Sequence, residues 1–257
     1  MFTLGIDVGS LTTKSLILED SNILSSSLLP TSEDASGTAA NAIEQSLKNA
    51  GLSLNQIEQI VSTGIGKGYT PYPTKQVAEL RCDTVGSRFL YPSVRGVIDI
   101  GAESCQVAKC DLRGNVVDFA VNDKCAGGTG IFLDTMAKVL QITPKEMEET
   151  YQTEEEVSIT STCAVFAESE VVSLIHKGGV SRFGIWRGIN KSIANRTYSL
   201  VAKLGIEGQI AVIGGVSRNP DFIASLEKMI GSKLLVPPQP QIVGALGAAI
   251  VAQRSVR

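Results

Sequence analysis

Two pairs of short hydrophobic segments occur along the chain, and in each pair the first segment ends in Asp-x-Gly. The first pair comprises residues 3–8 and 14–18, and the second comprises residues 97–100 and 105–110. Apolar runs of this length that are bounded by glycine predict buried strands. The pattern therefore predicts two copies of a strand–turn–strand unit, about one domain length apart.

The two Asp-x-Gly turns carry groups that can bind phosphate and Mg²⁺. Glycine lets the backbone approach a phosphate closely, and hydroxyl and amide N–H groups supply donors. Asp7 and Asp99 stand at the ends of their strands, where a carboxylate can hold Mg²⁺ directly or through water. Two ordinary hairpins are the alternative, but the duplication favours a nucleotide site.

Helical and strand-like segments alternate along the rest of the chain, which predicts an α/β protein. Helices are predicted at residues 37–50, 74–89, 131–140, 164–177, 184–204, 220–230 and 241–255 and from Thr143, and further strands at residues 57–62, 116–121, 209–213 and 234–236. The adjacent Gly214 and Gly215 would let the backbone lie against a nucleoside or phosphate. Small residues at 244–249 predict another backbone packed closely against the last helix.

Two of the five cysteines directly precede a helical pattern. Cys125 lies in a glycine-rich turn, and Cys163 follows residues that can cap a helix. Unpaired N–H groups at a helix start favour the thiolate, the form that binds metal or attacks. Two such cysteines are half of a four-thiolate iron–sulfur site, and a second copy of the chain across a two-fold axis would supply the other half. Inert cysteines are the alternative for either stretch alone.

The remaining cysteines and the single histidine are less suited to a metal site. Cys105 and Cys110 would face opposite sides of one strand, and Leu112 stands where the ferredoxin-type spacing needs a third cysteine. Cys82 falls in a predicted helix and is expected to be packed. With His176 alone, at a helix end, Ser–His–Asp catalysis and multi-histidine metal sites are nearly excluded.

Composition narrows the class of protein further. The 257 residues carry a net charge of −3 and are 43% hydrophobic, with a mean hydropathy of +0.15. This balance gives no indication of nucleic-acid binding, and no apolar run is long enough to span a bilayer. The N-terminus lacks the basic region of a signal peptide. We therefore expect a cytoplasmic protein that binds neither nucleic acid nor membrane, with thiols or metal ligands rather than disulfides.

The duplicated turns and the later glycine pair resemble the superfamily of actin, heat-shock chaperones and sugar kinases. This resemblance implies an α/β protein with a duplicated actin-like (ribonuclease H-like) ATPase fold and a nucleotide cleft between its two domains. The first domain is predicted at residues 1–92 with the C-terminal helix 242–257, and the second at residues 93–241, which carries the cysteine stretches.

Two stretches are more specific. Residues 122–130 and 161–170 resemble the ATP-dependent activators of 2-hydroxyacyl-CoA dehydratases, which belong with the ATPase subunits of benzoyl-CoA reductases. The likeness covers essentially the whole chain, and it includes residues 4–10 and 244–249. It implies a homodimer that holds one [4Fe–4S] cluster through Cys125 and Cys163 of each copy.

The same resemblance implies a site for ATP or ADP with Mg²⁺. The residues that match its nucleotide-binding segments are Ser10, Leu11, Thr12, Thr13, Lys14, Gly101, Ala102, Glu103, Gly214, Gly215 and Gln241. Asp7, Asp99 and Glu103 are the candidate catalytic residues. Hydrolysis would drive single low-potential electrons into a partner iron–sulfur enzyme. That partner would be a CoA-ester dehydratase, a reductase or a double-cubane-type protein, and ferredoxin or flavodoxin would be the reductant.

The chain departs from the family pattern, which indicates a divergent member. Ala102 replaces a glycine, and Glu103 replaces a glutamine that contacts the nucleotide, so that a second acid near the triphosphate could change the handling of Mg²⁺ or nucleotide. Residues 81–84 replace a Cys-His segment, and Ile131 replaces an arginine.

Two other classes of function remain open at this point. One is a small-molecule kinase of the same superfamily that has no cluster and uses Asp99 or Glu103 as its base. The other is an ATP-regulated interaction protein with inert cysteines.

Overall fold

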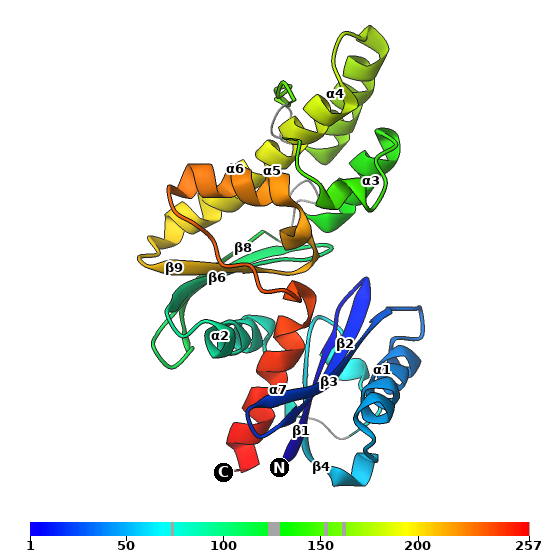
Figure 1. Cartoon of the computed structure of the whole chain (residues 1–257), viewed down its shortest axis with the longest axis vertical. Helices are drawn as coiled ribbons and strands as arrows, with labels where there is room; N and C mark the ends of the chain where they lie inside the picture. The colour runs from blue at the N-terminus through cyan, green and yellow to red at the C-terminus, as the bar shows by residue number, and fades with distance from the viewer. Residues whose placement is uncertain (73–74, 123–128, 152–153, 161–162, 257) are drawn as a thin grey trace. The chain divides into compact units, whose positions relative to one another are not determined.

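The computed structural model describes residues 1–72, 75–122, 129–151, 154–160 and 163–256 (Figure 1). Their contacts form two compact units. Unit 1 comprises residues 1–97, 108–118 and 237–257, and unit 2 comprises residues 98–107 and 119–236. This division crosses three strands of one sheet, so the domain limits predicted from the sequence remain a prediction.

Unit 1 is built on a five-stranded sheet in the order β3-β2-β1-β4-β5. Its strands are β1 (Phe2–Val8), β2 (Thr12–Glu19), β3 (Asn22–Pro30), β4 (Ile57–Thr63) and β5 (Lys75–Gln76). β1 runs antiparallel to β2 and parallel to β4. In this register Asp7 lies between Lys14 and Thr63, so the central strand delivers its aspartate to one end of the sheet.

Helices cover both faces of this sheet. They are α1 (Ala35–Ala50), α2 (Glu79–Leu90) and α7 (Val243–Val256), with short 3₁₀ turns η1 (Leu54–Gln56), η2 (Lys67–Tyr69) and η6 (Pro240–Ile242). The Asp34 side chain caps α1, and Gly51 ends it in the left-handed region. Side chains of α1 pack on β1 in one core, and side chains of α2 and α7 pack on β2 in another.

The second sheet has four strands in the order β8-β7-β6-β9. They are β6 (Val94–Ile100), β7 (Cys105–Cys110), β8 (Val116–Asn122) and β9 (Gln209–Ile213). The helices that follow them are α3 (Gly130–Val139), α4 (Ala164–Lys177), α5 (Arg182–Leu204) and α6 (Pro220–Ile230), with 3₁₀ turns η4 (Glu146–Glu148) and η5 (Gly215–Arg218). Figure 1 shows α5 and α6 side by side, and their buried residues share one core with β6 and β9.

The predicted repeat is confirmed by strand order and by turn geometry. The order 3-2-1-4 in the first sheet recurs as 8-7-6-9 in the second. In the first turn Gly9 N–H donates to the Thr12 carbonyl at 3.1 Å, and in the second Gly101 N–H donates to the Ser104 carbonyl at 3.0 Å. Each sheet therefore contains one copy of the strand–turn–strand unit, as in a duplicated actin-like ATPase.

Four segments differ from the sequence-based expectation. The strand expected at residues 234–236 is only an isolated bridge between Leu235 and Ala211. β3 was not predicted, because its central residues are serines. Two of those serine hydroxyls donate to carbonyls of α1, which satisfies them against the helix. Helix α2 begins at Glu79 rather than residue 74, since β5 occupies two of the intervening positions. The helix expected from Thr143 is only the 3₁₀ turn η4, although Glu146 and Thr143 cap each other as at a helix start.

Among the helices of the described residues, none has the length and apolar character that crossing a membrane requires.

The close backbone packing expected at the last helix is confirmed. A Cβ added at Gly247 of α7 would lie 1.8 Å from the Cys82 carbonyl oxygen, and one at Gly5 of β1 would lie 1.9 Å from the Ala245 carbonyl oxygen. No side chain fits at either distance. The glycines therefore let α7 approach both α2 and β1, which fixes the start of α7 near the end of β1.

We predict that Gly247→Ala destabilises the protein by about 1–3 kcal/mol, because the added methyl group overpacks the contact with α2. An alanine in a helix is otherwise more favourable than a glycine by about 0.5–1 kcal/mol. A lower free energy of unfolding in the variant would therefore indicate overpacking. Urea unfolding followed by circular dichroism measures it. Ser255→Ala, at an exposed position of the same helix, is the control and is expected to stay within about 0.5 kcal/mol. A stabilised Gly247→Ala protein would contradict the packing.

Candidate functional site

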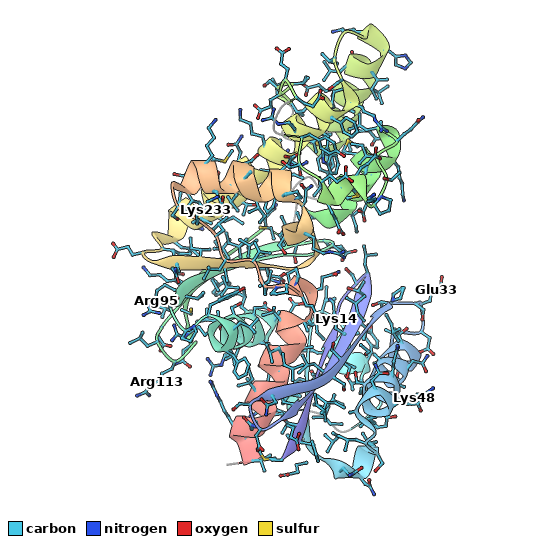
Figure 2. All side chains as sticks on the ribbon, in the orientation of Figure 1. Lys14, Glu33, Lys48, Arg95, Arg113 and Lys233 are labelled. Carbon is cyan, nitrogen blue, oxygen red and sulfur yellow. The ribbon has the colours of Figure 1, made fainter. Side chains whose placement is uncertain are left out.

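The first Asp-x-Gly turn holds an ion pair at its base. The ammonium of Lys14, which is labelled in Figure 2, lies 3.0 Å from Asp7 Oδ2, and the two side chains are only 13% and 16% exposed. Partial burial makes this pair stronger than a surface salt bridge. It leaves a cation and a carboxylate side by side at the turn, which is a suitable arrangement for phosphate and Mg²⁺.

Thr31, just after β3, fixes the shape of this turn. Its hydroxyl donates to the Gly9 carbonyl at 2.9 Å, and its N–H donates to the Leu11 carbonyl at 2.9 Å. The Thr13 hydroxyl is buried and shares a hydrogen bond with the Thr31 hydroxyl, so it supports the turn from inside. Ser10 and Thr12 are half-buried and Leu11 is exposed. The sequence did not point to Thr31, because it lies outside the turn in the chain.

A second carboxylate lies near Asp7. A Cβ added at Gly244, in the first turn of α7, would lie 3.4 Å from Asp7 Oδ2 and 3.2 Å from Asp83 Oδ1. Both carboxylates thus approach the N-terminal end of α7, where free N–H groups favour negative charge. Gln241 lies three residues earlier in η6 and is half-buried. In the sequence, Asp83 stands out only because residues 81–84 depart from the family pattern.

The second turn reproduces the glycine contact of the first. A Cβ added at Gly64 would lie 2.6 Å from Asp7 Oδ1, and one at Gly214 would lie 2.6 Å from Asp99 Oδ1. Both glycines have positive φ, 90° and 85°, a region that other residues rarely adopt. Each aspartate therefore faces the bare backbone of the glycine that directly follows the neighbouring strand, and unit 2 brings Asp99 together with Gly214.

The second turn is bonded to helix α3. Gly130 N–H donates to the Gly101 carbonyl at 2.9 Å, and Ile131 N–H donates to the Ala102 carbonyl at 3.0 Å. These donors belong to the first turn of α3, whose N–H groups have no partner within the helix. Glu103, the next residue of the turn, is exposed. A movement of this turn would therefore act directly on the start of α3.

The glycine pair after β9 is likewise tied to a helix. The Ser217 hydroxyl donates to the Gly214 carbonyl at 2.7 Å. Asn219 caps α6, and its side-chain amide donates to Asn190 Oδ1 of α5 at 2.8 Å. Both asparagines are buried, where an unmade hydrogen bond is costly. The segment with Gly214 and Gly215 is thus fastened to α5.

The cysteines separate into buried and exposed residues. Burial raises the pKa of Cys82 to about 12 and that of Cys105 to about 12, and it also raises the pKa of Cys110. As expected, Cys105 and Cys110 face opposite sides of β7, toward Thr197 of α5 and toward the Val94 carbonyl. These three thiols are buried, and Cys105 and Cys110 point away from each other, so they do not form a shared metal site.

Cys163 does fit. It is exposed and caps α4, in an extended conformation, and its carbonyl accepts a 2.8 Å hydrogen bond from Ala167 N–H. Helix α4 starts at the predicted position, and the predicted helix end at His176 is exposed. Cys125, the other predicted ligand, lies outside the described residues. Within the described part of the chain, no three His, Cys, Asp or Glu side chains come together as a metal site.

The chain belongs to the BadF/BadG/BcrA/BcrD ATPase family, whose model matches residues 4–252. It is 37% identical over 253 residues to the 2-hydroxyisocaproyl-CoA dehydratase activator of Clostridioides difficile, covering 98% of this chain and 95% of the relative. The predicted family is thereby confirmed.

Two solved structures match throughout. Component A of the (R)-2-hydroxyglutaryl-CoA dehydratase of Acidaminococcus fermentans has a TM-score of 0.92 and 36% identity, with all of both chains covered. The activator of the 2-hydroxyisocaproyl-CoA dehydratase of Clostridium difficile, with bound ADPNP, has a TM-score of 0.91 and 37% identity and covers 99% of this chain and 95% of that one. These matches confirm the predicted fold.

We predict that iodoacetamide at pH 7.5 labels Cys163 of iron-free Cys125→Ser protein and leaves Cys82, Cys105 and Cys110 unmodified. A thiol with a pKa of about 12 is almost entirely protonated at this pH, and only the thiolate attacks. Labelling of the buried cysteines should appear as pH rises toward their pKa values or when urea exposes them. Peptide mass spectrometry locates the label. Equal labelling of all four cysteines in the folded protein would contradict this assignment.

Proposed function

We propose that this chain is an ATP-hydrolysing electron donor that activates an iron–sulfur enzyme acting on CoA esters. Two observations support this proposal: membership of an ATPase family, and matches along its whole length to activators of CoA-ester dehydratases. The acceptor would be a dehydratase, a reductase or a double-cubane-type protein, and ferredoxin or flavodoxin would reduce the activator.

In this proposal the residues that match nucleotide-binding segments of the family bind ATP and Mg²⁺. Lys14 and the backbone of Ser10, Leu11 and Thr12 would contact phosphates. Asp7 and Asp99 would hold Mg²⁺, directly or through water, as carboxylates do. The other contacts would come from Thr13, Gly101, Ala102, Glu103, Gly214, Gly215 and Gln241. Glu103 is exposed, so its carboxylate is free to reach a metal-bound water.

We further propose that two copies of the chain share one [4Fe–4S] cluster through Cys125 and Cys163. Such a cluster, once bound, would supply a one-electron carrier. The chemistry of Cys163 supports this assignment, since its thiol is exposed at a helix start. Val165 and Phe166 in the next turn are 67% and 68% exposed. Apolar side chains beside an exposed thiol are what a surface covered by a second copy would present.

One observation carries the coupling of nucleotide to cluster: the two hydrogen bonds between the second turn and α3. Gly101 and Ala102 belong to the proposed phosphate turn, and Gly130 opens the helix that follows Cys125. A nucleotide that binds one position of the turn more tightly than another shifts their populations by that difference in affinity. The bonded helix start would follow, which changes the dipoles and hydrogen bonds around the cluster.

We predict that Cys163→Ser and Cys125→Ser each abolish iron binding and keep ATP hydrolysis within about threefold of the unchanged protein. A serine hydroxyl is a poor replacement for a thiolate on an iron–sulfur cluster, and neither cysteine belongs to the nucleotide segments. Iron and acid-labile sulfide on anaerobically purified protein measure the first effect, and phosphate release measures the second. Cys110→Ser is the control and should keep about four irons per dimer.

If the unchanged protein binds no iron after anaerobic reconstitution, the electron-transfer proposal fails, and a phosphotransferase or an ATP-driven switch becomes the better account.

We also predict that Gly130→Pro weakens the effect of nucleotide on the cluster. Proline is favoured at the first helical position and Thr129 is already extended, so α3 should persist. The N–H that donates to Gly101 is lost. In the unchanged protein, iron should leave to a chelator at different rates with ADP and with ADPNP. In the variant the ratio of the two rates should approach one.

Gly130→Ala is the control for this variant. It keeps the N–H and adds only a methyl group, 3.1 Å from the Gly101 carbonyl oxygen. It should retain most of the nucleotide effect. If the two rates of iron loss differ as much in Gly130→Pro as in the protein without substitutions, this hydrogen bond does not contribute to the coupling.

A further inference from the structure

Residues 154–160, here called the strap, lie along helix α5 and lead toward Cys163. Val157 N–H donates to the Gly184 carbonyl of α5 at 3.1 Å. A Cβ added at Gly184 would lie 2.4 Å from the Glu155 carbonyl oxygen, and one at Gly188 would lie 1.8 Å from the Val157 carbonyl oxygen. Because the two glycines are one turn apart, they form a bare stripe that receives the strap.

Polar contacts also hold the strap to α5. The Arg187 guanidinium donates to the Glu154 carbonyl, and Lys191 pairs with Glu156. The hydroxyl of Ser181, which caps α5, donates to the Glu154 carboxylate at 2.6 Å. Glu154 and Glu156 of the acidic run at residues 154–156 are therefore paired with side chains of α5 or of its cap. Val157 and Ile159 of the strap lie against Gly188 of α5.

Glu170, in the middle of α4, holds the far end of the strap. Its carboxylate accepts hydrogen bonds from Thr160 N–H at 3.0 Å and 3.2 Å, and another from the Thr160 hydroxyl at 3.0 Å. Hydrogen bonds to an ionised acceptor are stronger than those between neutral groups. Glu170 lies ten residues after Thr160, so these hydrogen bonds join the end of the strap to helix α4.

Bonded residues lie on both sides of Cys163 in the chain. On its C-terminal side the cysteine is the cap of α4, with its carbonyl bonded to Ala167 N–H. On its N-terminal side Thr160, three residues earlier, is bonded to Glu170 of the same helix. Helix α4 thus carries both the cysteine at its start and the carboxylate that binds the end of the strap.

We propose that Glu170 is a positioning residue for Cys163 that keeps its thiolate oriented toward the shared cluster. This inference rests on the proposed function of Cys163 as a cluster ligand. Glu170 does not bind iron in this account. It acts through Thr160, as partners behind a ligand do in other metal sites, where their loss costs about 10–100-fold in metal affinity.

The test compares three substitutions in the full chain. Glu170→Gln removes the charge and one of the acceptor oxygens, and Thr160→Val removes the hydroxyl while leaving all charges unchanged. Glu168→Gln is the matched control, because Glu168 is an exposed glutamate of the same helix. Circular dichroism and thermal unfolding establish that each protein is folded. If Glu170→Gln does not fold, Thr160→Val carries the test.

The first readout needs no cluster. In iron-free protein with Cys125→Ser, the rate of iodoacetamide labelling at Cys163 should rise by about threefold or more in Glu170→Gln, because the released chain exposes the thiol more often. It should rise in Thr160→Val as well, and the double variant should gain little beyond Glu170→Gln, since the two residues act through one contact. Glu168→Gln should label at the unchanged rate.

The second readout uses the reconstituted dimer. Iron should leave Glu170→Gln to a chelator about 10–100-fold faster than the unchanged protein, with an altered electron paramagnetic resonance spectrum of the reduced cluster. A helix that is merely less stable would lower the melting temperature without changing that spectrum.

Two results would overturn the inference: labelling rate, iron loss and spectrum all unchanged in Glu170→Gln, or equal changes in Glu168→Gln. If the protein without substitutions binds no iron, that result would count against the proposed function. The labelling rates would still decide the role of Glu170.

Discussion

Backbone hydrogen bonds join the start of α3 to the turn after β6, and the proposed coupling of nucleotide and cluster requires them. Helix-start N–H groups need acceptors, and here the carbonyls of Gly101 and Ala102 supply two of them. The turn itself is held in shape by the Gly101–Ser104 hydrogen bond and adjoins Asp99, which faces the bare backbone at Gly214. The proposed phosphate turn and the helix after Cys125 therefore cannot move independently without breaking backbone hydrogen bonds.

The second cysteine is connected to the proposed nucleotide segments by a different route within the same unit. Asn219, after the glycine pair, is bonded to Asn190 of α5. Helix α5 carries the strap on Gly184 and Gly188, and the strap ends at Thr160, which is bonded to Glu170 of α4, the helix that Cys163 caps. Packed contacts of this kind can carry coupling between sites. In this proposal each of the two cysteines is linked by hydrogen bonds and packing to a different nucleotide segment: Cys125 to the turn after β6, and Cys163 to the segment after β9.

Elements that depend on local sequence patterns were predicted correctly. The Asp-x-Gly turns, the strands around them and the start of α4 follow from short apolar runs, glycine and capping residues. Prediction from the sequence failed where long-range contacts decide: the serines of β3 become a strand only against α1, and Lys75 and Gln76 leave the predicted helix to pair with β4. The roles of Thr31, Asp83 and Glu170 depend on partners distant in the chain, so no spacing could reveal them.

Coupling between nucleotide and cluster can be measured as the midpoint potential of the reconstituted cluster in the protein without substitutions, first with ADP and then with ADPNP. Coupling between two sites is typically about 1–3 kcal/mol, and for one electron about 59 mV corresponds to a tenfold change in equilibrium. The account predicts a difference of at least about 40 mV between the two nucleotides, since about 1 kcal/mol of coupling corresponds to that shift. Identical potentials in a protein that holds its iron and hydrolyses ATP would contradict it.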